Sequence, residues 1–440
     1  MRRALYSAAL FIALPVTLVY LLWRSRRQPE YRLHWFERLG RFQPRSNGQP
    51  LIWIHAVSVG ETRAAQPLVN ALRKRYPDHQ LLFTHMTPTG RETARELYPQ
   101  ALRSYLPYDF PFAVRRFLDA YRPAIGIIME TELWPNVIAA ARQREIPVLL
   151  VNARMSEKSA RGYRRLASLT RDALGDLTAI GAQSEHDREA LTALGAPAVT
   201  VTGNLKFDVT LPENTDAQAQ ALRALIGHRP SWVAASTREG EEDLLLDALA
   251  LTGSGSLLVL VPRHPQRFDE VAQLLARRDV NYQRRSANQA VDARTEVFLG
   301  DSMGELHRYY GATDVAFIGG SLKPFGGQNL IEACALGKPV LLGPYTFNFA
   351  AAAQLAIDCG AAIRVKDARA LAIEVKRLLA APDERARRGQ AALEFARAHR
   401  GATTKTMAMI EAALDAAAAA SGSGMGSSRP QGRESRLPPG

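Results

Sequence analysis

Acidic side chains follow two apolar runs in the first half of the chain, where proton-transfer chemistry could be arranged. Glu61 stands in HAVSVGET, directly after the apolar run 51–59. We expect a strand to end at Val59, Gly60 to make the turn and Glu61 to begin a helix. The helix dipole would lower the pKa of this carboxyl group and keep it ionised, so that it could act as a general base on a hydroxyl group. A glutamate that only caps a helix would show the same pattern.

A second acidic pair stands in METELWPN, residues 129–136, where another apolar run gives way to polar residues. On an extended segment Glu130 and Glu132 would point to the same side, because side chains alternate along a strand. The pair could contact a substrate, or it could provide caps and surface hydrogen bonds.

Basic residues dominate the next polar segment, NARMSEKSARGYRR, residues 152–165. Its only acidic residue is Glu157, and its basic residues are Arg154, Lys158, Arg161, Arg164 and Arg165. The segment is suited to an anionic substrate, although a solvated basic helix would have the same composition.

The second half of the chain carries polar segments that favour nucleotide binding. ASTREGEE (235–242) and VPRHPQRF (261–268) both follow apolar runs, and Arg263 at such a strand end could pair with a phosphate. GDSMGELHRYY (300–310) should turn from strand to helix at Gly304–Glu305.

Four glycines, at 319, 320, 326 and 327, precede a helix that we predict to start near Gln328. Backbone N–H groups at such a helix start form an anion site. Glu332, about one turn inside, could bind the hydroxyl groups of a ribose.

Apolar runs predict two parallel sheets. They are continuous rather than alternating, which is typical of strands covered on both faces, and helical patterns separate them. The runs are 51–59, 80–86, 124–130, 147–153 and 177–184, then 231–236, 256–264, 295–301, 313–321 and 338–344. A polar connection at 209–220 divides the two sets. We therefore predict an α/β chain with two Rossmann-like domains facing a cleft and a hinge near residue 210.

The N-terminus predicts one transmembrane anchor. Residues 4–23 carry no charge, and a helix of this length spans about 30 Å, the thickness of a bilayer core. More arginines follow the run than precede it, so the remaining chain is expected on the cytoplasmic side. A cleaved signal peptide is disfavoured because the run ends in Trp23–Arg24 without a small-residue cleavage site.

The predicted division of the chain has five parts. They are an anchor at 1–23, a basic juxtamembrane linker at 24–50, an N-terminal domain at 51–209, a C-terminal domain at 210–415 and a disordered tail at 416–440. The linker could contact anionic head groups or remain solvated.

Composition limits the function classes. The chain has 56 Lys+Arg and 43 Asp+Glu, a net charge of +13, which favours anionic partners; the anchor favours lipid or phosphorylated substrates over nucleic acid. Two cysteines support neither a disulfide scaffold nor a Cys-rich zinc site. The sequence lacks GxxxxGK[ST], GxGxxG after a strand, HExxH and DxD, so a P-loop, a dinucleotide site and a metal mechanism have no support.

The motifs in order are HAVSVGE, ETELWPN, NARMSEKS, GNLKFD (203–208), ASTREGEE, VPRHP, GDSMGEL and GGxNxxEA. Over roughly residues 30–400 they resemble those of the Kdo transferases of Gram-negative bacteria. That family transfers 3-deoxy-D-manno-oct-2-ulosonic acid (Kdo) from CMP-Kdo to the lipid A precursor, lipid IVA, at the inner membrane. The resemblance implies the GT-B glycosyltransferase architecture, with the acceptor in the first domain and the CMP-sugar donor in the second, and neither a metal nor another cofactor.

The resemblance also assigns residues. Glu61 matches the general base of the family. CMP-binding positions fall on Pro262, Arg263, Met303, Gly304, Glu305, Asn329, Leu330, Ile331 and Glu332. Further substrate contacts are expected at Ser58, Gly60, Glu132, Arg154, Lys206 and Gln328. Gln328 is a departure, because the family commonly has a histidine there, and glutamine donates a hydrogen bond but carries no charge.

The expected reaction is an inverting, metal-independent transfer. Glu61 would remove the proton of the acceptor hydroxyl, while Arg263 and the helix start near 328 would neutralise the leaving phosphate. A related membrane-associated GT-B enzyme with a UDP-sugar donor is the alternative within the same fold. A membrane-tethered binding protein would not need these strand-end motifs.

Overall fold

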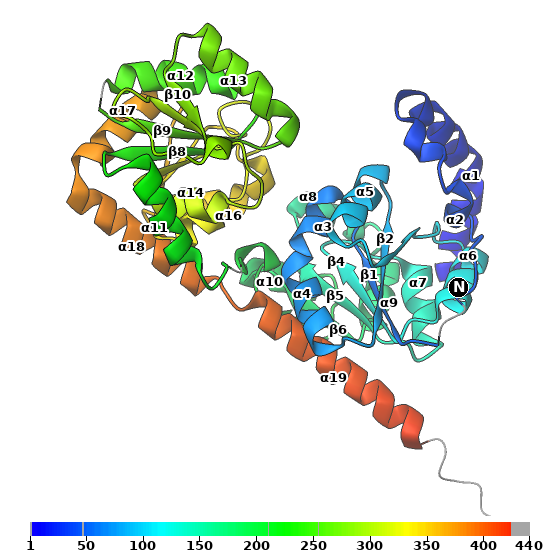
Figure 1. The fold of residues 1–440 in the computed structure, drawn as a ribbon. Helices are drawn as coiled ribbons and strands as arrows, with labels where there is room; N and C mark the ends of the chain where they lie inside the picture. The colour runs from blue at the N-terminus through cyan, green and yellow to red at the C-terminus, as the bar shows by residue number, and fades with distance from the viewer. Residues whose placement is uncertain (1, 46–47, 210, 254, 424–440) are drawn as a thin grey trace, which may run out of the picture. The chain divides into compact units, whose positions relative to one another are not determined.

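Figure 1 shows the computed structural model, which describes residues 2–45, 48–209, 211–253 and 255–423. They form two compact units. The first comprises the described residues up to Asp208 and those from Gly401 onward, and the second runs from Val209 to Arg400. Each unit is built on its own parallel sheet, which confirms the predicted pair of Rossmann-like domains.

The first unit contains a seven-stranded sheet in the order β3-β2-β1-β4-β5-β6-β7. Its strands are β1 (Leu51–His55), β2 (Gln80–His85), β3 (Leu102–Tyr105), β4 (Ile125–Met129), β5 (Val148–Ala153), β6 (Ala179–Ala182) and β7 (Thr200–Val201). Its connecting helices are α3 (Val59–Ala64), α4 (Gln66–Arg75), α5 (Pro88–Leu97), α6 (Pro111–Tyr121), α7 (Pro135–Arg142), α8 (Glu157–Arg164), α9 (Ala167–Gly175) and α10 (Glu185–Ala193).

Both faces of this sheet are buried. Leu51 and Trp53 of β1 pack into the cluster that contains the apolar side chains of α6 and α7, whereas Ile52 and Ile54 pack with those of α4. A strand that is buried on both faces has no solvent-facing position, so every one of its residues can be apolar. This is why β1 reads as a continuous apolar run.

The second unit contains a seven-stranded sheet in the order β10-β11-β9-β8-β12-β13-β14. Its strands are β8 (Ser231–Thr237), β9 (Leu257–Pro262), β10 (Tyr282–Arg284), β11 (Val297–Leu299), β12 (Val315–Ile318), β13 (Val340–Leu342) and β14 (Ala362–Arg364). Its helices are α11 (Thr215–Ile226), α12 (Glu241–Thr252), α13 (Phe268–Arg277), α14 (Leu306–Ala312), α15 (Ile331–Ala335), α16 (Ala350–Asp358), α17 (Ala368–Ala380) and α18 (Pro382–Ala398).

In both sheets the chain starts in the middle and proceeds outward in two directions. The strands at which the direction changes are the neighbours β1 and β4 in the first unit, and β8 and β12 in the second. Connections diverge at such a switch point, and open α/β sheets bind ligands outside the carboxyl ends of these strands. The topology therefore defines where each unit offers a site.

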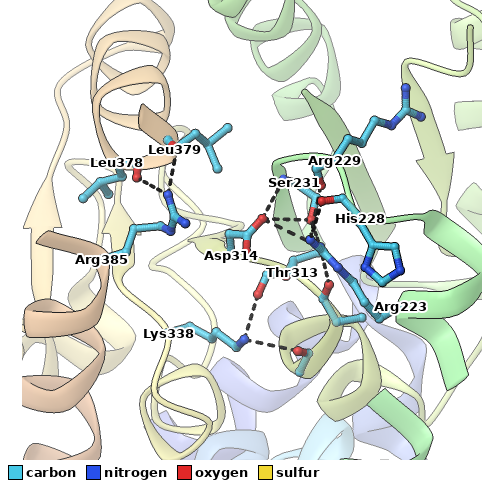
Figure 2. Close-up of polar contacts among 12 residues, drawn as sticks. Arg223, His228, Arg229, Ser231, Thr313, Asp314, Lys338, Leu378, Leu379 and Arg385 are labelled. Atoms are coloured by element: carbon cyan, nitrogen blue, oxygen red, sulfur yellow. Dashed lines mark hydrogen bonds and ion pairs between the residues drawn. The ribbon is translucent and has the colours of Figure 1, made fainter. Parts of the chain in front are cut away.

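A polar network fixes the opposite, amino-terminal edge of the second sheet (Figure 2). The Arg223 guanidinium donates a 2.6 Å hydrogen bond to Ser231 Oγ and lies 3.7 Å from Asp314 Oδ2. Asp314 also accepts the N–H of Ser231 (2.9 Å), and Lys338 Nζ donates to the carbonyl oxygen of Thr313 (2.8 Å). Burial lowers the pKa of Lys338. These contacts join the starts of β8, β12 and β13, so we assign them a structural role.

The last helix, α19 (Ala402–Ser423), returns to the first unit. Asp208 Oδ1 accepts the N–H of Gly401 (2.7 Å), and Met407 and Ile410 are buried in the core beside α4. The prediction that 401–415 belong to the C-terminal domain is therefore wrong. So is disorder for 416–423, because the alanine-rich sequence continues the helix; residues 424–440 lie outside the described residues.

The N-terminal helix α1 (Arg2–Arg27) is long and apolar enough to cross a membrane. Its first turns also pack on the first unit. Asn136 Nδ2 donates a 3.0 Å hydrogen bond to Ser7 Oγ, and the rings of Phe11 and Phe110 are 4.8 Å apart. The other side of α1 is apolar and exposed, with Ile12 at 80% and Val16 at 72%. The expected anchor is thus a helix attached to the body along its start.

In the described part of the segment 24–50, residues 24–45 and 48–50, the alternative of a solvated linker does not hold throughout, because short helices form and part of the segment packs on the first unit. The short helices are η1 (Pro29–Arg32) and α2 (Trp35–Arg38). Arg38 is buried, donates to the carbonyl oxygen of Met86 (3.0 Å) and stacks 3.8 Å from the centre of the Tyr105 ring. Glu37 pairs with Arg91 at 2.6 Å. Because the Arg38 side chain is buried, it contributes little to a basic surface that could contact lipid head groups.

Candidate active site

Glu61 lies beyond the carboxyl end of β1, at the switch point of the first sheet. Its side chain is 9% exposed. Oε1 accepts a 2.8 Å hydrogen bond from Ser58 Oγ, and Oε2 accepts one of 2.8 Å from the N–H of Val57. Ser58 is the N-cap of α3. The carboxylate is therefore fixed by the turn that starts its own helix.

The turn itself differs from the prediction. The strand ends at His55, and α3 begins at Val59 rather than at Glu61. Gly60 lies inside the helix, is exposed, and would leave a Cβ atom in ordinary contact with Ser58 Oγ at 3.7 Å. The backbone at position 60 does not require a glycine. Because Gly60 is exposed and has no side chain, there is open space beside it for a ligand.

The pKa of Glu61 is raised to about 7, not lowered as the helix dipole predicts. Burial is the main cause, because it disfavours the charged form, and the charge of Glu130 adds to it. The hydrogen bonds from Val57 and Ser58 act in the opposite direction and are outweighed. A carboxyl group with such a pKa is ionised about half the time at neutral pH and can exchange a proton readily.

Glu130 and Glu132 follow β4, the other strand of the switch point. Glu130 has φ +60°, so the segment is not extended and the predicted i, i+2 alignment does not apply. Glu130 Oε1 lies 3.7 Å from Lys206 Nζ. Burial, together with the charge of Glu130, raises the pKa of Glu132. Three carboxyl groups are thus gathered at this edge, with the Lys206 ammonium group beside Glu130.

Lys206 is held in place by two asparagines that sequence reasoning did not single out. Asn152, at the end of β5, has φ +53° and accepts the N–H of Leu205 on its Oδ1 (3.0 Å). Asn204 accepts the N–H of Lys206 (3.0 Å). Asparagine tolerates the left-handed region better than most residues, and this was the available signal in the motif NAR.

Arg154 lies at the same edge, with its side chain exposed and its carbonyl oxygen bound by Thr131 Oγ1 (2.8 Å). The helix that follows, α8, exposes Lys158, Arg161 and Arg164. Tyr163 donates a 2.7 Å hydrogen bond to the carbonyl oxygen of Thr131 and so ties α8 to the segment after β4. The basic surface predicted at 154–165 is present beside the carboxylates.

In the second unit, Pro262 closes β9 and Arg263 follows it. The N–H of Arg263 donates to the carbonyl oxygen of Thr237 at the end of β8 (3.0 Å). Burial raises the pKa of Glu332, while the positive charge of Arg263 acts against it. Arg263 and Glu332 are therefore within electrostatic reach of each other at the carboxyl edge of this sheet.

The segment after β11 provides Met303, Gly304 and Glu305. Met303 is 55% exposed, and Gly304 has φ +76°. Burial raises the pKa of Glu305, but a hydrogen bond from Ser302 and the charges of Arg285 and Arg308 outweigh it and leave the pKa lowered. Arg285 Nε lies 3.1 Å from Glu305 Oε2. The Glu305 carboxylate is thus already occupied by protein partners.

The glycine-rich segment 319–328 does not lead directly into a helix. The helix predicted at 328–336 is the five-residue α15, which begins at Ile331. Asn329 Oδ1 accepts the N–H of Ile331 (3.0 Å), so a side chain already occupies that donor. Leu330 and Ile331 are 0% and 1% exposed, so they support this segment from inside rather than offer surface to a ligand. Glu332 is the second residue of α15, not one turn inside it.

Glu241 is a further residue that sequence reasoning missed. It is fully buried at the start of α12 and accepts the N–H groups of Arg238 (2.9 Å), Gly320 (2.5 Å) and Leu322 (2.9 Å). It therefore ties the segment after β8 to the segment after β12. In sequence it is indistinguishable from an ordinary first-turn acid. Over the residues that the structure describes, no group of three or more His, Cys, Asp or Glu side chains is arranged to hold a metal ion.

Two Rossmann-like domains, each with its own parallel sheet and strand-end site, form the GT-B architecture of glycosyltransferases. Residues 277–395 match the model for glycosyl transferases group 1. A Neisseria meningitidis UDP-GlcNAc 2-epimerase has the same fold, with a TM-score of 0.54 at 15% identity over 82% of this chain and 99% of that one. A Rickettsia africae glycosyltransferase gives 0.52 at 14% identity over 84% and 99%.

The family follows from sequence similarity. Residues 33–209 match the 3-deoxy-D-manno-octulosonic-acid transferase (kdotransferase) model. The 3-deoxy-D-manno-octulosonic acid transferases of Bordetella pertussis and Haemophilus influenzae are 44% and 38% identical over 93% and 94% of this chain and 99% of each relative. The C-terminal CMP-Kdo binding domain of an Acinetobacter baumannii protein is 34% identical over 42% of this chain and 98% of that one, with a TM-score of 0.40. The chain belongs to the 3-deoxy-D-manno-octulosonic acid transferase family, the enzymes of Kdo transfer in lipopolysaccharide synthesis.

Proposed function

We propose that the protein transfers Kdo from CMP-Kdo to the lipid A precursor lipid IVA, with Glu61 as the general base and inversion at the anomeric carbon. The family supports the substrate class. The observation that carries the role of Glu61 is its carboxyl group at the switch point of the first sheet, held by Ser58 Oγ and the N–H of Val57, where burial and Glu130 raise its pKa to about 7. A general base works best when its pKa lies near the operating pH.

The acceptor is a sugar hydroxyl, which is a poor nucleophile until it loses its proton. Glu61 accepts that proton while the oxygen attacks the anomeric carbon of Kdo and the bond to the CMP phosphate breaks. A single displacement assisted by one base inverts the configuration at the anomeric carbon. Ser58 and the N–H of Val57 hold the carboxylate in position during the attack. Glu132, Arg154, Lys206 and the open space above Gly60 are assigned to substrate contacts.

The second unit is assigned to CMP. Arg263 neutralises the phosphate as it leaves, and Glu332 accepts hydrogen bonds from the ribose hydroxyl groups. Pro262, Met303, Gly304, Glu305, Asn329, Leu330 and Ile331 line the same carboxyl edge. Gln328 donates a hydrogen bond in place of the histidine expected there. Leu330 and Ile331 are buried and are assigned to supporting this edge.

The membrane assignment rests on α1. Its exposed apolar side runs from Leu5 through Ile12, Val16 and Val19 to Trp23. Arginines are concentrated after this surface, at 24, 26, 27 and 32, and this charge asymmetry supports a body on the cytoplasmic side of the inner membrane. The exposed basic residues of α8 are suited to the phosphate groups of an anionic acceptor lipid.

The test is a transfer assay with purified full-length protein. CMP release is followed with CMP-Kdo as the donor and lipid IVA as the acceptor, in the absence and in the presence of EDTA. The mass of the lipid product is determined by mass spectrometry. The proposal predicts CMP release that depends on lipid IVA, a product heavier by Kdo, and no effect of EDTA. Release of UDP from a UDP-sugar, with CMP-Kdo inert, would contradict it.

A further inference from the structure

The switch point of the second sheet carries two cations that have no role so far. Arg238 follows β8, and Lys323 lies in the segment after β12. These two strands are neighbours in the middle of the sheet. A doubly wound sheet binds its ligand at this place, whereas Arg263 follows β9, one strand further out.

The backbone around these cations is tightly fixed. Gly319 approaches the end of β8 so closely that a Cβ atom on it would lie 2.6 Å from the carbonyl oxygen of Ser236. Ser236 itself has φ +60°, at the point where the β8–β9 register shifts. The buried Glu241 carboxylate binds the N–H groups of Arg238 and Gly320. The segments after β8 and β12 therefore form one rigid surface.

Three side chains gather over Gly320. A Cβ atom built on this glycine would lie 3.2 Å from Gln328 Nε2, 3.5 Å from Arg238 Cγ and 3.6 Å from Phe325 Cβ. The Arg238 guanidinium lies over the Phe325 ring, 4.8 Å from its centre. An arginine stacked on an aromatic ring keeps its N–H fork free to bind an anion in its own plane. The uncharged Gln328 thus has a permanent positive charge beside it.

Lys323 adds a second charge to this surface. Its Nζ atom lies beside Gly240, only 2.3 Å from where a Cβ atom would stand. Within the described part of the chain, neither Lys323 nor Arg238 forms an ion pair with a carboxylate. Glu241, the nearest acid in sequence, already binds three backbone N–H groups. Two partly buried cations are left for an anionic ligand.

We infer that Arg238 and Lys323, with Gln328 as a hydrogen-bond donor, bind the carboxylate of the donor sugar. This inference rests on the proposed function. Kdo is a 2-ulosonic acid, so its anomeric carbon bears both the phosphate oxygen and a carboxylate. The donor therefore presents two anions close together, and a site with Arg263 alone would leave one of them unmatched. The Arg238 fork matches a carboxylate in a two-pronged way, and it selects an acidic sugar over a neutral one.

CMP and CMP-Kdo separate the two anions experimentally, because CMP has the phosphate but no sugar carboxylate. In Arg238→Gln, we expect unchanged CMP affinity by calorimetry and a KM for CMP-Kdo raised about 10- to 100-fold, the usual effect of losing a charged hydrogen bond. Arg238→Lys should restore part of this loss. Arg263→Lys should weaken CMP and CMP-Kdo alike. Arg294→Gln, at an arginine side chain that is 88% exposed, serves as the control and should change neither.

Two results would overturn the inference. Equal weakening of CMP and CMP-Kdo in Arg238→Gln would place the guanidinium on the phosphate, and wild-type values for both ligands would remove it from the site. Thermal unfolding of each variant verifies that the second unit is folded. Failure of the wild-type chain to use CMP-Kdo at all would refute the proposed function instead, so the two failures are distinguishable.

Discussion

Ser58 Oγ donates a 2.8 Å hydrogen bond to Glu61 Oε1 and accepts the N–H of Glu61 at 3.4 Å. One serine therefore caps α3 and stabilises the ionised form of the carboxylate. Burial and the charge of Glu130 favour the protonated form. The pKa of about 7 is the balance of these opposing causes, and each of them can be changed by a single substitution.

Ser58→Ala should raise the pKa of Glu61, because the carboxylate loses a hydrogen bond that favours its charged form. We expect the acid limb of kcat/KM to move to higher pH by about one to two units, since a hydrogen bond to a charged group is worth roughly 1.5–3 kcal/mol. Ser184→Ala is the matched control, because Ser184 caps α10 and pairs with Asp187 in the same way. An acid limb that stays in place in Ser58→Ala would argue against Glu61 as the titrating group.

Glu130→Gln should shift the acid limb in the opposite direction. Removing the negative charge lowers the pKa of Glu61, because the charge of Glu130 is the largest cause of its rise after burial. Glu132→Gln should give a smaller shift, because Glu132 contributes least to the raised pKa of Glu61. A pH–rate profile for each variant measures the size of the two shifts. Equal shifts in the two variants, or no shift in either, would contradict the electrostatic account.

The core strands could be predicted from the sequence, and the sheet edges could not. The strands β4 and β9 are continuously apolar, and β1 and β8 are polar only at their ends, because both faces of these strands are buried. The four unpredicted strands, β3, β7, β10 and β14, stand at the edges of the two sheets. They are short and partly exposed; the three residues of β10, Tyr282–Arg284, are all only half-buried. An edge strand carries no apolar run that would distinguish it from a loop.

The positions of the candidate residues at strand ends could be predicted from the sequence, but their electrostatics could not. Residue order alone places Glu61 and Arg263 at strand ends. The pKa of Glu61 depends on how deeply the side chain is buried and on Glu130, which comes from a different strand, and neither is visible in a local motif. Glu241 and Arg238 were missed for the same reason. Their roles arise from contact with Gly320, about 80 residues later in the chain.

Ile410→Ala should destabilise the first unit, because Ile410 is fully buried against it. The expected loss in the free energy of unfolding is about 2–5 kcal/mol, as for other buried Ile→Ala changes. Glu411→Ala is the control one residue later; its ion pair with Arg75 is partly exposed and should be worth less than about 1 kcal/mol. Chemical denaturation measures both. Equal, small losses would mean that α19 does not pack on the first unit.

Removal of residues 1–23 should weaken vesicle binding and also lower the thermal stability of the first unit. The stability loss is expected because Phe11 packs on Phe110 and Ser7 bonds Asn136. Ile12→Asn separates the two effects, since Ile12 is 80% exposed and should reduce vesicle binding alone. Co-sedimentation with anionic vesicles, at low and high salt, and thermal unfolding are the readouts. Undiminished vesicle binding by the truncated chain would remove α1 from the role of anchor.

The most direct test of the central claim compares single-turnover Kdo transfer by wild type and Glu61→Gln, with saturating CMP-Kdo and lipid IVA. The rate is measured over a range of about four pH units, from about pH 5 to about pH 9, centred on the pKa of the base. The account predicts an acid limb near pH 7 for wild type. It predicts that Glu61→Gln folds, binds CMP with wild-type affinity, transfers Kdo about 10²- to 10⁴-fold more slowly and lacks this limb. Transfer at a near-wild-type rate, or an unchanged acid limb in the variant, would contradict it.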